Sequence, residues 1–364
     1  MNNDSNAKPI NWLSREAVPE HVSQESVHKL STNENPLGPS PAAIEAIRNF
    51  APALAEYPPT GDGSLRQVLA EIHGKGLTPD HFFTTSSGSE GLEYIGRAFL
   101  RPGDECIICS PAFSVYNWAA GLQNASLVDV PLDPEKLTHR IDAILNAITE
   151  KTRLLFLSNP HNPAGTIISR DDMERLYSEL PEHVTVVSDE VYIHYVDDPQ
   201  YPDSVEDMFQ GRNVVMLYSF SKAYGLAGMR LGYGIARPDL AARVAAFRRT
   251  FHLGTLVMEA GMAALQDTDH LQESVTLAQT GRSWLYKQLD RLGLHTWPSQ
   301  SNFILVRLPV PAYEVAVRLL DYGVIVMPQA KSSMPDCIRV SIGLQEGNEA
   351  FIVALEQILG GTPG

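Results

Sequence analysis

Several features that mark common protein classes are absent from this sequence, or nearly so. Cysteine occurs three times in 364 residues, and no group of cysteines and histidines has the spacing of a zinc site. No apolar stretch approaches the roughly 20 residues that span a membrane, and the first residues lack the apolar core of a secretory signal. The net charge is −15, from 28 basic and 43 acidic residues without a basic run, which argues against nucleic acid or an anionic membrane as a partner. We therefore expect a cytoplasmic protein without a metal.

Two of the cysteines, Cys106 and Cys109, have the spacing of a redox CxxC motif. They lie in an apolar segment at 105–109 that is typical of a strand. Residues three apart on a strand point to opposite faces, so we interpret both cysteines as structural. The chain length, with 44% hydrophobic and 20% charged residues, instead suits an enzyme with one large and one small domain.

The most informative stretch begins at Ser219, after the apolar segment 214–218, which predicts a buried strand. Lys222 therefore follows a strand end, where ligands bind in open α/β sheets. The hydroxyls of Ser219 and Ser221 and the guanidinium of Arg230 can together hold a phosphate. Two interpretations stay open from these residues alone. Lys222 forms a Schiff base with an aldehyde cofactor, or it is an isolated lysine in a solvated loop.

Two other predicted strands also end at residues that suit a cofactor site. The strand at 152–157 leads into a rigid Asn-Pro-His-Asn-Pro-Ala-Gly turn that contains Asn162. The strand at 184–188 ends at Asp189, and a buried aspartate needs a cationic partner. Glu190 is the alternative acid.

The predicted strand at 82–85 is followed by a run of small residues, Ser86-Ser87-Gly88-Ser89-Glu90, at the start of a helix. Backbone N–H groups at such a helix start can hold a phosphate. The carboxylate of Glu90 can instead cap the helix.

In order and spacing, these motifs resemble those of fold-type I pyridoxal-phosphate (PLP) enzymes, and in particular class I/II aminotransferases of the histidinol-phosphate aminotransferase type. The resemblance extends from about Leu30 to Gly343. It implies an α/β fold with a mostly parallel central sheet in a large domain and a smaller α/β domain. We predict an N-terminal arm and part of the small domain at 1–45, a large PLP-binding domain at 46–245 and a small C-terminal domain at 246–364. Residues 238–267 predict one long helix that leads into the small domain.

The resemblance also implies a role for each matching residue. Lys222 carries PLP as a Schiff base and moves the proton, Asp189 pairs with the pyridine nitrogen, and Tyr192 hydrogen-bonds the 3′ oxygen; these three are the predicted catalytic residues. Asn162 also binds the 3′ oxygen, and Phe113 stacks on the ring. The predicted phosphate ligands are Ser89 and Glu90 through their amides, Ser219, Ser221, Arg230, and Tyr57 from the neighbouring subunit of a homodimer. The predicted substrate ligands are Asn35, Asn162 and Arg339, the last of which binds the α-carboxylate.

The function that the resemblance implies is the transfer of an amino group between an L-amino acid and a 2-oxo acid, by ping-pong kinetics, in amino-acid biosynthesis. The alternatives on the same scaffold are a decarboxylase, a lyase or a cyclase. The sequence departs from the histidinol-phosphate type after the strand at 324–327, where the usual phosphate-binding arginine is missing and Lys331 is a displaced substitute. The aromatic-Pro-Gly pattern of the arm is also missing at 17–20. We therefore expect a neutral or aromatic amino acid, or a specialised biosynthetic substrate, in place of histidinol phosphate.

Overall fold

The computed structural model describes residues 10–58 and 61–360, which form two compact units. The larger unit contains residues 34–279 and 297–302, and the smaller unit contains the residues up to 33, 280–296 and those from 303 onward. Along the described ranges, no helix combines the length and apolar character needed to cross a membrane.

The larger unit is built on a seven-stranded sheet. In spatial order its strands are β2 (Phe82–Thr85), β8 (Gly232–Ala236), β7 (Val214–Ser219), β6 (Thr185–Asp189), β5 (Thr152–Ser158), β3 (Glu105–Ile108) and β4 (Ser126–Asp129). Within this sheet β8 runs antiparallel to both neighbours, and β3 to β7 pair in parallel. The expected mostly parallel central sheet is therefore confirmed. Its inner strands β6 and β7 are buried along their whole length, which explains the apolar residues Val214-Val215-Met216-Leu217 of β7 and Val186-Val187 of β6.

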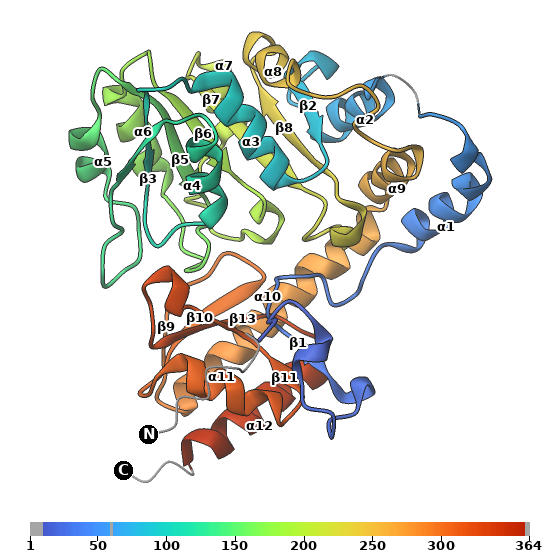
Figure 1. The fold of residues 1–364 in the computed structure, drawn as a ribbon, viewed down its shortest axis with the longest axis vertical. Coiled ribbons are helices and arrows are strands. Elements are labelled where there is room, and N and C mark those ends of the chain that lie inside the picture. Colours follow the sequence, from blue (N-terminus) through green and yellow to red (C-terminus); the bar gives the residue numbers. More distant parts are fainter. Residues whose placement is uncertain (1–9, 59–60, 361–364) are drawn as a thin grey trace. The chain divides into compact units, whose positions relative to one another are not determined.

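The helices of the larger unit are α1 (Pro41–Phe50), α2 (Gly63–His73), α3 (Gly88–Phe99), α4 (Ser114–Gly121), α5 (Ile141–Ala147), α6 (Arg170–Glu179), α7 (Ser204–Phe209), α8 (Pro238–Ala245) and α9 (Thr255–Gln266). Of these, α2, α3, α4, α7 and α8 pack on strands of the sheet, whereas α1 packs along α9. Helices α3 and α4 lie side by side (Figure 1). The core beneath them includes Phe83, Leu92, Phe156 and Leu217. This packing fixes the starts of α3 and α4 at the strand ends where the predicted site residues lie.

The larger unit contains two segments that the sequence assigned elsewhere, 34–45 and 246–279. Their membership follows from packing, because α9 packs closely along α1 and also along α2. The single helix expected at 238–267 is wrong: the chain forms α8 and α9, with an irregular segment at 246–254 between them. Phe251 in that segment has a φ of 56°, a left-handed conformation that a continuous helix does not contain.

The smaller unit has a four-stranded antiparallel sheet and a short parallel pair. The sheet order is β12 (Met327–Pro328), β13 (Cys337–Ser341), β10 (Phe303–Arg307) and β9 (His295–Thr296), and β1 (His28–Lys29) pairs with β11 (Val324–Ile325). Its helices are α11 (Ala312–Leu320) and α12 (Gln345–Gly360), and the boundary between the units falls within α10 (Thr268–Arg291).

Candidate functional site

Asp189, the last residue of β6, is a buried carboxylate whose hydrogen bonding is incomplete. Its side chain is 5% exposed, and its Oδ2 accepts a hydrogen bond from the Tyr116 hydroxyl at 2.8 Å. The other oxygen, Oδ1, is buried and has no hydrogen-bond partner among the residues that the structure describes. Burial raises the pKa of Asp189 to about 6, although the Tyr116 hydroxyl, the backbone N–H of Val191 and the positive charge of Lys222 lower it. A protonated ring nitrogen would supply a donor for Oδ1 and a second positive charge beside the carboxylate.

Glu190, the alternative acid, is already fully engaged by the protein. Its Oε1 accepts hydrogen bonds from Ser188 at 2.7 Å and from Ser204, and its Oε2 accepts one from Tyr218 at 2.8 Å. Burial raises the pKa of Glu190 to about 7, against the effect of these hydroxyls. Glu190 therefore serves to hold the end of β6, and the geometry favours Asp189 as the acid that pairs with a ligand.

Lys222 lies in a tight turn that begins where β7 ends. The turn is closed by the Gly225 N–H, which donates to the Lys222 carbonyl at 2.9 Å, and by the Ser221 N–H, which donates to Ser219 Oγ at 3.1 Å. Gly225 has a φ of 66°, and a Cβ built on it would lie 2.0 Å from the carbonyl oxygen of Gly38. Only glycine suits this position, because the backbone is left-handed and there is no room for a Cβ atom.

Three predicted ring ligands lie near the same strand ends. The Nζ of Lys222 is 5.7 Å from the centre of the Tyr192 ring. Asn162 is held in its turn by its own N–H, which donates to Ser158 Oγ at 3.3 Å. Phe113 immediately precedes α4 and meets the Tyr116 ring edge-on, with 5.9 Å between the ring centres. Tyr116 thus connects Phe113 with the buried acid Asp189.

The start of α3 is capped by its own side chains. Ser87 Oγ accepts a hydrogen bond from the Glu90 N–H at 3.1 Å, and the Glu90 carboxylate accepts one from the Ser86 N–H at 2.6 Å. The backbone amide of Glu90, which the sequence analysis assigned to a phosphate, is therefore used by the cap. Ser89, one position earlier, lies in the first turn of the helix and keeps its amide at the positive end of the helix dipole.

Two other predicted phosphate ligands lie in exposed surroundings. Tyr57 is 85% exposed and stacks on Phe251, with 4.9 Å between the ring centres. Arg230 lies at the end of the Lys222 turn and donates to the Ala227 carbonyl at 2.8 Å.

The side chain of Asn35 is buried and joins the chain before α1 to the Lys222 turn. Its Nδ2 donates to the Ala223 carbonyl at 2.9 Å and to Ser274 Oγ at 2.7 Å, and its Oδ1 accepts from the Leu37 N–H. The predicted substrate ligand Asn35 therefore has a supporting role for the Lys222 turn in this structure.

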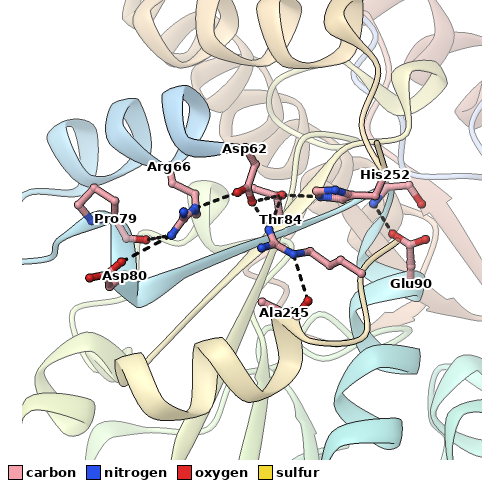
Figure 2. Close-up of polar contacts among 10 residues, drawn as sticks. Asp62, Arg66, Pro79, Asp80, Thr84, Glu90, Ala245 and His252 are labelled. Carbon is pink, nitrogen blue, oxygen red and sulfur yellow. Dashed lines mark hydrogen bonds and ion pairs between the residues drawn. The ribbon is translucent and has the colours of Figure 1, made fainter. Parts of the chain in front are cut away.

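A buried charge network, which we call the Asp62 network, joins α2, β2 and the segment after α8 (Figure 2). Asp62 is 2% exposed and accepts hydrogen bonds from Arg66 Nε at 3.0 Å, from Arg248 and from the Thr84 hydroxyl. His252 Nε2 lies 2.8 Å from the same Thr84 oxygen. Burial would raise the pKa of Asp62, but the Thr84 hydroxyl and the two guanidinium groups hold it below its usual value.

The Asp62 network extends to the start of α3. Thr84 lies on β2, the strand that leads into α3, and His252 lies beside Glu90 (Figure 2). Burial and the charge of Arg248 lower the pKa of His252, although Asp62 and Glu90 raise it. The network therefore anchors the irregular segment 246–254 to the strand that positions the α3 cap.

Arg339 lies on β13 of the smaller unit. Its Nη2 donates to the Ser31 carbonyl at 2.8 Å, and its guanidinium carbon lies 5.4 Å from the centre of the Phe303 ring.

Two features of the site were missed by the sequence analysis. Tyr116 gave no signal beyond an aromatic residue in an apolar helix, and its contact with Asp189 spans 73 positions. The Asp62 network gave none either: Asp62 directly precedes α2, a position typical of a helix cap, yet its side chain does not cap that helix.

Comparisons with known proteins agree on one family. The model of the family described as aminotransferase class I and II matches residues 25–355. A histidinol-phosphate aminotransferase of Akkermansia muciniphila is 40% identical over 97% of this chain and 94% of its own length, and histidinol-phosphate aminotransferase 1 of Nitrosococcus oceani is 38% identical over 97% and 93%. A solved histidinol-phosphate aminotransferase of Sinorhizobium meliloti, in complex with pyridoxal-5′-phosphate, superimposes with a TM-score of 0.84 at 26% identity, covering 91% of this chain and 90% of that one.

Proposed function

The chain belongs to the class I and II aminotransferases and is a PLP-dependent aminotransferase, and from this premise we propose which of its residues carry the reaction. When bound, PLP supplies an aldehyde that carries the amino group and a ring that withdraws electrons from the reacting carbon. The substrates are amino acids and oxo acids. The remaining question is what this chain contributes around the cofactor.

The observation that carries the proposal is the buried Asp189 with its unpartnered oxygen. We assign Asp189 Oδ1 to the pyridine nitrogen, because an ion pair there keeps the ring protonated and satisfies a carboxylate that burial otherwise disfavours. The Tyr116 hydroxyl fixes the other oxygen. Asn162 and Tyr192 then hold the 3′ oxygen, and Phe113 covers one face of the ring.

Lys222 has two tasks in this proposal. Its Nζ would hold the cofactor through the aldehyde, with loss of water, and the amine that an incoming amino acid displaces would accept the proton from the substrate Cα and donate it again as the amino group is transferred. The short turn closed at Gly225 limits where the amine can move.

The cofactor phosphate is assigned to hydroxyls and amides at two strand ends. Ser219, Ser221 and Arg230 surround the Lys222 turn, and the Ser89 amide comes from the start of α3. Because Tyr57 is highly exposed, its side chain is available to a second copy of the chain. We therefore propose a homodimer in which Tyr57 completes the phosphate site of the neighbouring subunit.

The substrate is proposed to be an α-amino acid without a phosphate. Arg339 suits the α-carboxylate, because a guanidinium binds a carboxylate through two parallel hydrogen bonds. The relatives are named for histidinol phosphate, but Met327 on β12 supplies no positive charge where the resemblance leads us to expect an arginine. Histidinol phosphate is the second candidate, since the names of the relatives favour it.

A single-turnover experiment with the holoenzyme tests both parts of this proposal. The twenty proteinogenic L-amino acids and histidinol phosphate are mixed separately with the enzyme, and the absorbance band near 400 nm, the released oxo product and CO2 are followed. We expect loss of the band with an α-amino acid and without CO2. Histidinol phosphate as the fastest substrate would contradict the substrate assignment, and CO2 release with an unchanged band would contradict transamination by these residues.

The variant Lys222→Ala tests the residue assignment. It should bind PLP without a covalent bond, so that borohydride no longer fixes the cofactor to the chain, and turnover should be lost. Lys151→Ala, which changes an exposed lysine of the larger unit, is the matched control and should keep both properties. A Lys222→Ala enzyme that still couples PLP covalently and turns over would refute the assignment.

A further inference from the structure

The N-terminal segment, residues 10–33, is an ordered part of the smaller unit. Val18 and Val27 are buried together with Leu320 of α11 and Ile325 of β11. Strand β1 pairs in parallel with β11. The sequence predicts an N-terminal arm and part of the small domain here, but it indicates neither the packing of this segment nor a purpose for it.

The end of the segment is tied to both neighbouring strands. The Leu30 N–H donates to the Ile325 carbonyl, and the Leu30 carbonyl accepts from the Ser341 N–H, each at 2.8 Å. The backbone next to Ser31 is therefore fixed between β11 and β13. Since Arg339 lies two residues before Ser341 on β13, this places Ser31 beside Arg339.

Ser31 connects the start of the segment with Arg339 through two hydrogen bonds. Its hydroxyl, which is fully buried, donates to the Trp12 carbonyl at 2.6 Å. Its carbonyl accepts from Arg339 Nη2 at 2.8 Å. The Phe303 ring lies 5.4 Å from the guanidinium carbon. The Ser31 carbonyl and the Phe303 ring thus both help to direct the guanidinium.

We infer that the N-terminal segment is a positioning element for Arg339, acting through Ser31. This inference rests on the proposed function, in which Arg339 binds the substrate carboxylate. A long, flexible side chain loses conformational freedom when it binds a ligand. Because Ser31 and Phe303 already restrict the Arg339 side chain in the folded protein, less conformational entropy is lost when the substrate binds. Trp12 holds Ser31 through its carbonyl, and its ring meets Tyr313 edge-on at 5.9 Å.

The test uses Ser31→Ala in the full-length holoenzyme. The half-reaction is measured with the proteinogenic L-amino acid that converts the cofactor fastest, over a range of concentrations. Ser31→Ala keeps the carbonyl that Arg339 contacts but removes the hydrogen bond to Trp12 that helps to hold this carbonyl in place. We expect the half-saturating concentration to rise by up to about tenfold, the most that the loss of one neutral hydrogen bond gives, while the limiting rate stays nearly unchanged. Ser23→Ala removes an exposed hydroxyl of the same segment and should change neither quantity.

The variant Arg339→Gln separates this inference from the proposed function. If Arg339→Gln leaves the half-saturating concentration unchanged, the carboxylate assignment fails and the inference fails with it. If Arg339→Gln raises it but Ser31→Ala does not, only the positioning role is overturned. In the Arg339→Gln background, Ser31→Ala should have no further effect; an equal effect in both backgrounds would mean a general structural role and overturn the inference.

A second variant keeps the test decisive if Ser31→Ala does not fold. Trp12→Ala removes the ring contact with Tyr313 and leaves the buried Ser31 side chain intact. It should raise the half-saturating concentration in the same direction, with the limiting rate preserved. A fall in the limiting rate alone would contradict the inference.

Discussion

Replacing Asp189 by asparagine should stabilise the protein when the cofactor has been removed. The native side chain is a buried carboxylate with one oxygen that lacks a hydrogen-bond partner in the part of the chain that the structure describes. Asparagine has nearly the same shape and no charge. Its oxygen can still accept the hydrogen bond from Tyr116, which lies 2.8 Å from Oδ2. The substitution therefore removes an uncompensated buried charge and leaves the packing intact.

The size and pH dependence of this effect follow from the pKa of Asp189. Burial raises it from 3.8 to about 6, which corresponds to roughly 3 kcal/mol at about 1.4 kcal/mol per pKa unit. Because the folded apoenzyme binds this proton more tightly than the unfolded chain, the penalty is absent below about pH 4, grows between about pH 4 and 6, and is complete above that. The asparagine variant has no such dependence, so its advantage should increase by about 2–3 kcal/mol between pH 4 and pH 8.

Urea unfolding of the two apoenzymes, at equal protein concentration and at several pH values, measures this difference. Asp80→Asn, at a position that is 82% exposed, is the control and should show no such trend. With PLP the order reverses: the variant should bind the cofactor more weakly, because the pyridine nitrogen loses its ion pair. Two results would show that the Asp189 carboxylate carries no uncompensated buried charge. One is an apoenzyme variant that is less stable than the native protein at pH 8, and the other is a difference in the free energy of unfolding that is the same at all pH values.

Two further substitutions test the framework around the site. Asp62→Ala removes the buried carboxylate to which both Arg66 and Arg248 donate, and should lower the free energy of unfolding by about 3–5 kcal/mol. Asp80→Ala, at the exposed position, should change it by less than about 0.5 kcal/mol, and urea titrations compare the two. Equal effects would mean that the network adds no stability. Gly225→Ala places a Cβ 2.0 Å from the Gly38 carbonyl oxygen at a φ of 66°. It should therefore distort the Lys222 turn and weaken the covalent attachment of PLP, which is measured by absorbance. The control is Gly121→Ala, whose Cβ meets no atom within 4 Å and which should leave the attachment unchanged. Full attachment in Gly225→Ala would show that the turn tolerates a side chain.

The sequence alone determined the family, the cofactor and the positions of the main site motifs. This was possible because each motif is local. A buried parallel strand contains a short apolar run, and the residue that we propose as functional follows that run within a few positions, as Lys222 follows β7 and Asp189 ends β6. The carboxyl ends of parallel strands meet at one edge of a sheet, so that order and spacing were sufficient.

Only the tertiary structure decided which groups complete and support those motifs. Tyr116 reaches Asp189 across 73 positions, Arg248 reaches Asp62 across 186, and Arg339 reaches Ser31 across 308. The irregular segment at 246–254 interrupts an otherwise helical pattern because its side chains pair with Asp62 and Thr84 far away in the chain. Local propensity and periodicity contain no information about such partners. These long-range pairs form only in the folded chain. Folding removes polar side chains from water, and each side chain then needs a hydrogen-bond donor or acceptor that lies nearby in space.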